Sequence, residues 1–415
     1  MVCRVVQWYK WQKCIIGYEI KVYMSIEPKI IRITTVPLSL KILLKGQHRF
    51  MSSNGFEVIG VSSQEKELEE VQNEEGIRVV SIEMTRMIAP LKDVKSLWNF
   101  YKLCKKEKPM IVHSHTPKAG IVSMLGAKLA GVPIRLHTVA GMPLMEAKGI
   151  KRTILDVVEK LTYASATKVY PNSKGLYDFI LQNNFAPKSK LKVIANGSSN
   201  GIDTAFFAPE QISDTQKVRL KKELEINDND FVFVFVGRLV ADKGINELVT
   251  AFSKLSKEKK NIKILLVGPF ESDLDPLNNE TLEEIKKNKN IIAVGYQKDV
   301  RPYFAISNIL TFPSYREGFP NVVMQAGAMG LPSIVSDING CNEIIEEGKN
   351  GTIIPVKDSN AIYSAMQRMM DDEVFYKQLK SNVREMITSR YEQSLVWNAL
   401  LEEYNTLLKE KGYVV

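Results

Sequence analysis

The chain has 415 residues, which is long for one hydrophobic core and sufficient for two domains. Its 45% hydrophobic and 25% charged residues are typical of a globular protein. The sequence contains no run of 18 apolar residues, so no transmembrane helix is predicted. The net charge of +9 is compatible with nucleic acid, anionic lipid or phosphorylated substrates as partners. Because interleaved aromatic and basic RNA-binding patterns are absent, no nucleic-acid partner is expected.

The cysteines are scattered along the chain without CxxC pairing: Cys3, Cys14, Cys104 and Cys341. This spacing argues against a zinc site and against a disulfide framework. It favours a reducing, cytoplasmic compartment.

Residues 1–23 fit neither a helical period nor a strand alternation, and they lack the apolar core of a signal peptide. A strand pattern begins directly after Met24. Two interpretations stay open for this extension: an overcalled start of translation, or a short basic and aromatic segment lying on a membrane surface.

Residues 24–200 alternate short apolar, β-branched runs with helical patterns, which predicts a parallel sheet covered by helices on both faces. The expected strands are 30–36, 57–61, 77–82, 110–114, 134–138, 168–170 and 191–194. Helices are expected between them, among others at 39–53, 94–106 and 119–130.

The pattern restarts at Phe231, with strands expected at 231–236, 263–267, 291–294, 309–313, 333–336 and 351–355. The stretch 196–211 is rich in Gly, Ser, Asn and Pro, as a hinge would be. We therefore expect a second domain over 201–390, and a last helix within 391–415 that packs back on the first domain. The predicted α/β architecture is two Rossmann-like, doubly wound domains that face each other across a cleft containing the ligand.

The stretch VGRLVADKG, residues 236–244, ends a buried strand and leads into a helix. Gly237 makes the turn, and Arg238 and Lys243 flank the loop. Two cations beside a helix N-terminus can bind a pyrophosphate, because backbone N–H groups and the helix dipole add to the side-chain charges. A basic surface turn is the alternative. The sequence matches neither a Walker A loop nor a GxGxxG motif.

The stretch SYREGFPNVVMQAG, residues 314–327, also runs from a strand into a helix. Glu317 lies just before the helix, where its carboxylate can accept hydrogen bonds from sugar hydroxyls, or can simply be a favourable charge at a helix start. The backbone amides of Phe319, Pro320 and Asn321 are expected to point into the cleft. Gln325 lies inside the helix, and whether its side-chain amide reaches the cleft depends on the orientation of that helix.

Together these stretches resemble the retaining GT-B glycosyltransferases of family 4, which use nucleotide sugars. The matching pieces are Gly237-Arg238 with Lys243-Gly244, Glu317 to Asn321 with Gln325-Ala326, GLPSIVSDINGCNEII at 330–345, and EEGKNGTIIPV at 346–356. Their order and spacing agree over residues 24–415. Several motifs in register are far more specific than any one of them.

The resemblance implies that Arg238 and Lys243 hold the donor diphosphate and that Glu317 binds donor-sugar hydroxyls. The second acid of the family's E-x7-E pattern usually binds the ribose, and here it is Gln325. An amide can still accept a hydrogen bond from a hydroxyl, so ribose binding remains compatible with Gln325. The substitution puts in doubt only the requirement for a negative charge at this position.

Three histidines lie at the ends of predicted strands of the first domain. His115 is the catalytic candidate, because the resemblance places a histidine there beside donor sugar and acceptor, where it could orient a hydroxyl or stabilise charge. His113 is expected to be structural, and no carboxylate lies at metal-ligand spacing. His137 resembles the family's acceptor-side loop. Lys45 and Gly46, in the segment nearest the cleft after the first strand, are the other acceptor-side candidates.

We therefore expect a metal-independent enzyme without cofactor that moves a hexosyl or N-acetylhexosaminyl group from a UDP-sugar to a polyprenyl-diphosphate saccharide, with retention. It would work in surface polysaccharide synthesis, peripherally on the inner face of the cell membrane. The leucine-rich segment 40–45 would contact the membrane or pack in the core. A GT-B-like epimerase, a phosphorylase or a non-enzymatic nucleotide-sugar-binding scaffold are the alternatives. The sequence specifies neither the donor sugar nor an oligomeric state.

Overall fold

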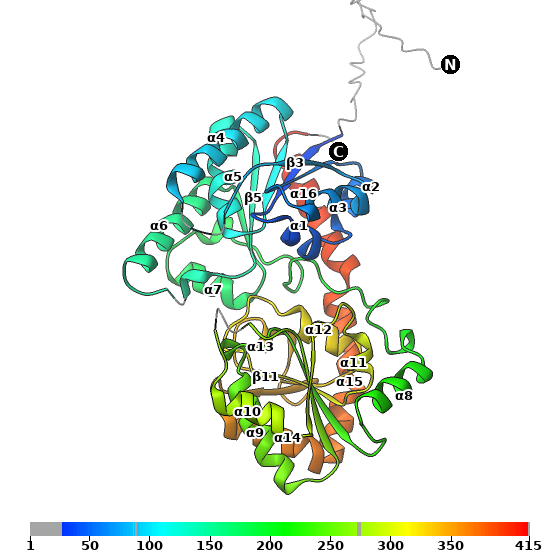
Figure 1. Cartoon of the computed structure of the whole chain (residues 1–415). Helices are drawn as coiled ribbons and strands as arrows, with labels where there is room; N and C mark the ends of the chain where they lie inside the picture. The colour runs from blue at the N-terminus through cyan, green and yellow to red at the C-terminus, as the bar shows by residue number, and fades with distance from the viewer. Residues whose placement is uncertain (1–26, 86, 88, 146, 272–274, 414–415) are drawn as a thin grey trace, which may run out of the picture.

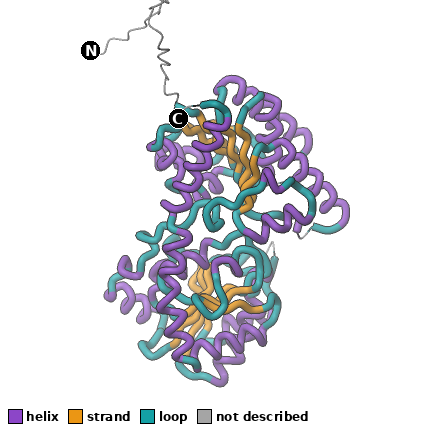
Figure 2. The backbone as a smooth tube through the Cα atoms, turned by 180° about the vertical axis from the view of Figure 1, so that it is seen from behind, coloured by secondary structure: helices purple, strands orange, loops and turns teal. Residues whose placement is uncertain are grey.

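The computed structural model describes residues 27–85, 87, 89–145, 147–271 and 275–413. Two α/β halves lie one above the other (Figure 1), each with its own sheet (Figure 2). The expected N-terminal extension, 1–23, lies outside the described residues. The α/β class with two Rossmann-like halves is confirmed.

The first half contains a six-stranded parallel sheet in the order β3-β2-β1-β4-β5-β6. Its strands are β1 (Lys29–Ile33), β2 (Glu57–Ser62), β3 (Arg78–Ser81), β4 (Ile111–Ser114), β5 (Ile134–Val139) and β6 (Lys168–Pro171). Its helices are α1 (Pro37–Leu43), α2 (Gln47–Ser53), α3 (Lys66–Glu75), α4 (Pro90–Glu107), α5 (Pro117–Ala130), α6 (Gly149–Ser165) and α7 (Lys174–Gln182).

Alternation along each strand divides this half into two apolar layers. Ile31 and Ile33 point to the face covered by helices that include α4 and α5. Ile30 points to the opposite face, which is covered by α1, α2 and α3. Both faces of the sheet are therefore buried, as its near-continuous apolar strands require.

The second half has the strand order β12-β11-β10-β7-β8-β9, again all parallel. Its strands are β7 (Phe231–Val236), β8 (Ile262–Val267), β9 (Ile291–Gly295), β10 (Ile309–Phe312), β11 (Ser333–Ser336) and β12 (Gly351–Ile354). Its helices are α8 (Asp214–Glu223), α9 (Ile245–Glu258), α10 (Asn279–Lys287), α11 (Arg301–Ala305), α12 (Asn321–Ala328), α13 (Cys341–Ile344), α14 (Ser359–Asp371) and α15 (Glu373–Tyr391).

The last helix, α16 (Gln393–Glu410), leaves the second half and packs on the first. Figure 1 shows it in red, running upward from the end of α15. Its Leu400, Tyr404 and Leu408 join the apolar layer that contains Ile30. The end of the chain therefore completes the core of its beginning.

Two expectations about local structure are wrong. The segment 39–53 is two helices, not one, because Gly46 adopts a left-handed backbone (φ 78°) between α1 and α2. The segment 191–194 is not a strand: Leu191 makes a single isolated bridge to Val169 beyond the edge of the sheet. None of the helices within the described ranges is long and apolar enough to cross a membrane.

Candidate active site between the two halves

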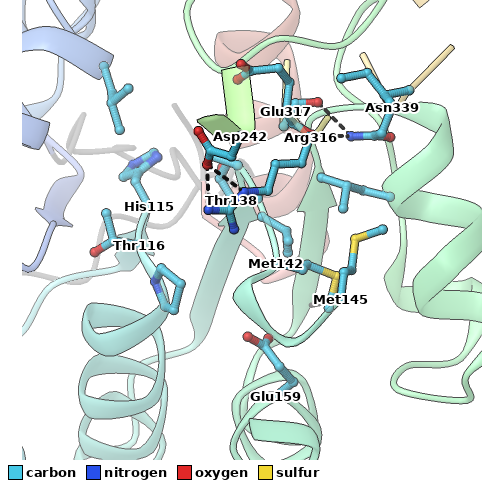
Figure 3. Close-up of a pocket in the computed structure, with 18 of the residues that line it drawn as sticks. His115, Thr116, Thr138, Met142, Met145, Glu159, Asp242, Arg316, Glu317 and Asn339 are labelled. Atoms are coloured by element: carbon cyan, nitrogen blue, oxygen red, sulfur yellow. Dashed lines mark hydrogen bonds and ion pairs between the residues drawn. The ribbon is translucent and has the colours of Figure 1, made fainter. Parts of the chain in front are cut away.

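A cavity of about 730 Å³ lies where the carboxyl ends of both sheets face each other. The first half contributes His115, the β5 segment from His137 with the loop after it, and Glu159; the second contributes Arg238, Asp242, Lys243 and Glu317. Figure 3 shows His115 and Glu159 of the first half around the same cavity as Asp242 and Glu317 of the second. The two motifs identified in the sequence thus share a single cavity with the first-half histidine His115.

The loop between β7 and α9 supplies the two cations expected for a diphosphate. Arg238 follows the end of β7 and pairs with Glu271 at 2.9 Å, and this hydrogen bond raises the pKa of Arg238. Lys243 ends a short 3-10 turn directly before α9. Both cations line the cavity beside the N-terminus of α9, where the helix dipole also favours an anion.

Glu317 lies against Lys243, with 2.5 Å between Oε1 and Nζ. The Ser314 hydroxyl donates to the same Oε1 at 3.1 Å. The family resemblance implies different parts of a donor for these two residues, and the structure places them in direct contact. Because Lys243 and Glu317 are largely buried, each fixes the position of the other in the absence of a ligand.

A second ion pair, between Asp242 and Arg316 at 2.7 Å, lies next to the first, and sequence reasoning missed it. The Asp242 N–H also donates to Asp275 at 2.6 Å. Asp242 stands inside the motif between Arg238 and Lys243, so the signal was present in the sequence. Its carboxylate and Arg316 hold the β7–α9 loop to the segment that carries Glu317.

The segment before α12 differs in detail from the expectation. Pro320 precedes the first helical residue and has no N–H, so only the Phe319 and Asn321 amides can donate there. The Phe319 ring is buried, 5.5 Å from the Tyr391 ring, and therefore packs in the core. Gln325 is half-buried one turn into the helix. Neither these residues nor Gly237 is among those that line the cavity.

His115 is buried, and both of its ring nitrogens lack a hydrogen-bond partner within the described chain. Its ring lies 4.1 Å from that of His113. Burial, with the neighbouring His113, holds the pKa of His115 well below its usual value, so the imidazole is neutral. A neutral imidazole can donate from one nitrogen and accept at the other.

His113 is fixed from both sides. Its Nδ1 shares a hydrogen bond with the Tyr404 hydroxyl at 2.6 Å, and its Nε2 shares one with Thr138 at 2.8 Å. His113 therefore has the structural environment expected for it. Through Tyr404, helix α16 supports the ring on which His115 packs.

The acceptor-side candidates are dispersed. His137 lines the cavity, hydrogen-bonds Ser114 at 2.8 Å, and has its pKa lowered to about 4 by burial. Lys45 and Gly46 do not line the cavity, contrary to expectation. Gly46 packs against Trp397 of α16, whose ring would lie 2.7 Å from an added Cβ atom, so its role is to let α16 approach.

Direct contacts close the two halves around the cavity. An added Cβ atom at Gly318 would lie 1.8 Å from the Ala140 carbonyl oxygen of the other half, so only glycine fits there. Glu343 accepts the backbone N–H groups of Lys174 and Gly175 at 2.7 and 3.1 Å, at the start of α7. Asn339 accepts from Ser173 at 2.7 Å. The cavity is therefore bounded by residues that also hold the halves together.

Among the described residues, no group of three or more His, Cys, Asp or Glu side chains is arranged to hold a metal ion. The cations of the second half and the neutral imidazole of the first are the chemically distinctive groups of the cavity. This arrangement can bind an anionic leaving group on one wall and a hydroxyl nucleophile on the other.

Two family models match the chain, one in each half. Residues 49–197 match the glycosyl transferase 4-like domain. Residues 216–386 match glycosyl transferases group 1. Each match covers most of the corresponding Rossmann-like half.

Full-length relatives agree with these matches. The chain is 35% identical over 382 residues, 92% of this chain and 98% of the relative, to a capsular polysaccharide biosynthesis glycosyltransferase, CapM, of Staphylococcus aureus. It is 32% identical over 70% of its length, and 74% of the relative, to the UDP-Gal:alpha-D-GlcNAc-diphosphoundecaprenol alpha-1,3-galactosyltransferase of Escherichia coli.

The fold is shared with Anabaena HepE in complex with UDP and glucose, with a TM-score of 0.75 at 17% identity, over 91% of this chain and 100% of that one. This likeness shows the fold, and the closer relatives above show the family. With two doubly wound halves, a cavity between them and matching domains in both, the chain is a GT-B glycosyltransferase of the family that joins a glycosyltransferase 4-like domain to a group 1 domain.

Proposed function

We propose that this glycosyltransferase moves a hexosyl or N-acetylhexosaminyl group from a UDP-sugar to a polyprenyl-diphosphate saccharide in surface polysaccharide synthesis. Two relatives support this: one is named for capsular polysaccharide biosynthesis, and the other for a UDP-Gal donor and a GlcNAc-diphosphoundecaprenol acceptor. The choice among donor sugars is left to experiment.

The observation that carries the proposal is the placement of Arg238 and Lys243 beside Glu317 in one cavity, with His115 on the facing wall. As the glycosidic bond to the nucleotide breaks, negative charge develops on the leaving diphosphate. Two cations and the start of α9 would stabilise that charge, the task that a general acid performs in a hydrolase.

Donor binding would rearrange the carboxylates that these cations contact in the free protein. A diphosphate near Lys243 competes with Glu317 for the ammonium group, which frees Glu317 to accept hydrogen bonds from sugar hydroxyls. The existing ion pair thus keeps both side chains in the cavity until the donor arrives.

We propose retention by attack of the acceptor hydroxyl on the face that the leaving group departs from. Double displacement needs an unencumbered nucleophile beside the anomeric carbon. In the donor complex Glu317 would accept from sugar hydroxyls and from Ser314, so it is better suited to binding than to covalent catalysis. His115 would orient the acceptor hydroxyl. The contacts between the halves would exclude water and so suppress hydrolysis of the donor.

A lipid-linked acceptor requires access from a membrane, and helix α6 offers the better surface. The expected segment 40–45 is unsuited, because Leu40 and Leu44 are buried in the core and Lys41 pairs with Glu70 and Glu74. Along α6 an exposed apolar stripe follows the helical period: Ile150, Ile154, Val157 and Leu161. Exposed lysines flank it at 148, 151 and 160, as anionic lipid headgroups would favour.

We also propose that the protein lies peripherally at the cytoplasmic face of the membrane, where UDP-sugars would reach it. We also propose that transfer needs neither metal nor cofactor, since Arg238, Lys243 and the helix dipole can neutralise the diphosphate. Transfer rates measured with and without EDTA test this point: equal rates are expected, and a loss restored by a divalent cation would contradict it.

The decisive experiment incubates the purified protein with radiolabelled UDP-Gal, UDP-GalNAc, UDP-Glc or UDP-GlcNAc and a polyprenyl-diphosphate N-acetylglucosamine. We expect one labelled sugar to enter the lipid fraction. NMR of the product should show the same anomeric configuration as in the donor. An inverted product would refute retention. Label that stays water-soluble as an epimerised UDP-sugar would favour an epimerase, and unchanged UDP-sugar that remains bound would favour a scaffold.

A further inference from the structure

Glu159 is a buried carboxyl that the donor chemistry does not use. It lies on the inward face of α6, its residue is only 6% exposed, and it lines the cavity. Among the described residues, the neighbouring Tyr163 hydroxyl is the one side chain that interacts with this carboxyl as a hydrogen-bond partner. A carboxyl accepts several hydrogen bonds, so Glu159 has capacity left for a polar ligand in the cavity, and leaving that capacity unused costs stability in a buried site.

The surroundings of Glu159 define what could bind. Figure 3 shows it below Met142 and Met145, on the far side of the cavity from Glu317. Leu176 from α7 completes this apolar wall. Thioether and leucine side chains can cover the C–H face of a pyranose ring or an acetamido methyl group. The carboxyl can meet the hydroxyl edge of the same ring.

We propose that Glu159, Met142, Met145 and Leu176 form a subsite for the terminal sugar of the acceptor, with Glu159 hydrogen-bonded to its hydroxyls. The proposal rests on the function proposed above and extends it to the acceptor. A polyprenyl chain would offer the carboxyl no polar group, and a diphosphate would bring negative charge next to an acidic group. A neutral saccharide satisfies both the apolar wall and the carboxyl.

The position of α6 connects this subsite with the membrane. The exposed stripe that contains Ile150 and Val157 lies on one face of the helix, and Glu159 lies on the other. An acceptor whose lipid stays in the membrane beside the stripe could therefore place its sugar against the inner face of the same helix. Burial also raises the pKa of Glu159 to about 7, so its carboxyl can donate as well as accept near neutral pH.

The test measures initial rates with polyprenyl-diphosphate N-acetylglucosamine at saturating UDP-sugar. For Glu159→Gln we expect the acceptor KM to rise about tenfold, as the loss of one buried hydrogen bond to the sugar predicts, with the donor KM unchanged. Glu159→Asp keeps a carboxyl group, so its acceptor KM should rise less than that of Glu159→Gln. The matched control is Glu69→Gln, the same change at an exposed glutamate of α3 that does not line the cavity.

An unchanged acceptor KM in folded Glu159→Gln, or an equal rise in the donor KM, would overturn the subsite. Circular dichroism and UDP binding establish that each variant is folded. If Glu159→Gln is not folded, Glu159→Asp is measured in its place, and a smaller rise in the acceptor KM is expected for it. Binding of octyl N-acetylglucosaminide by NMR separates the two proposals: its loss in Glu159→Gln supports the subsite even if transfer fails in wild type, and its retention refutes it.

Discussion

The two walls of the cavity are built on opposite principles. The wall from the second half is charged and ion-paired, with Arg238, Lys243 and Arg316 each against a carboxylate. The wall from the first half is buried and neutral, and its ionisable groups are His115, His137 and Glu159. Charges at loop ends suit an anionic donor, whereas neutral groups in an apolar wall suit a hydroxyl-bearing acceptor.

The largest expected effect is on the charged wall. Lys243→Ala removes a cation from the developing diphosphate charge, and we expect kcat to fall by about 10² to 10³. Steady-state transfer rates at saturating acceptor measure the loss. The control is Lys257→Ala, at an exposed lysine of α9, the helix that follows Lys243, and its rate should be within twofold of wild type. Similar rates for the two variants would remove Lys243 from the site.

Glu317→Gln should have the next largest effect. The amide keeps the shape but weakens the hydrogen bonds to donor hydroxyls, which we expect to lower kcat/KM for the UDP-sugar by roughly 10- to 100-fold. The variant also leaves Lys243 without its carboxylate partner. Donor titrations at fixed acceptor measure the change. If only the affinity for the acceptor fell, Glu317 would bind the acceptor and its assignment to the donor would be wrong.

The neutral wall predicts a pH-dependent stability. Burial raises the pKa of Glu159 from its ordinary value of 4.5 to about 7 in the folded protein. Below pH 4.5 the carboxyl is neutral in both the folded and the unfolded chain, so its burial costs no charge desolvation. As pH rises through 7 the buried carboxyl must ionise, and the free energy of unfolding falls. Glu159→Gln cannot ionise and should become more stable relative to wild type between pH 5 and 8, by up to roughly 3 kcal/mol.

Urea unfolding across that pH range measures the difference. The other titratable groups near this wall are Asp156, whose charge contributes to the raised pKa, Tyr163, and His137, whose pKa of about 4 keeps it neutral throughout. A stability difference that does not vary with pH would show that Glu159 is not held in a neutral, desolvated environment.

Tyr404→Phe tests the support of the neutral wall by α16. It leaves the buried Nδ1 of His113 without a partner, which should cost about 1 to 3 kcal/mol of unfolding free energy. Urea unfolding at pH 7 checks this value. Tyr296→Phe, at an exposed ring, is the control and should cost almost nothing. Equal stability of the two variants would show that the hydrogen bond contributes little.

The smallest effect is expected at Gln325. Gln325 does not line the cavity in the free protein. We therefore expect the activity of Gln325→Glu to lie within about threefold of wild type, a change no larger than a partly exposed polar contact contributes. The KM for the UDP-sugar is the sensitive measurement. A loss comparable with that of Glu317→Gln would show that a charge at this position is incompatible with donor binding.

The fold was largely predictable because apolar strand and helix periods are local signals. Strands such as 231–236 are visible as continuous β-branched and aromatic runs. The errors lie where local signals conflict with packing. Gly46 divides one predicted helix because Trp397, 351 residues later, needs the space. No local pattern contains that contact.

The site was predictable in part for the same reason. Arg238, Lys243 and Glu317 stand at strand-to-helix turns, so their place in a cleft follows from topology. The ion pair between Lys243 and Glu317 does not follow, because it depends on how two loops meet. Glu159 was missed because a glutamate in an amphipathic helix usually faces solvent, and only the tertiary packing of α6 shows that this one faces the cavity.

Hydrogen–deuterium exchange with UDP tests the division of the cavity most directly. We predict that UDP protects the amides of 237–245 and 317–322 and leaves those of 149–165 unchanged, since the diphosphate would contact the charged wall alone. Protection of 149–165 by UDP, without protection at 237–245, would contradict the assignment of donor and acceptor to the two walls.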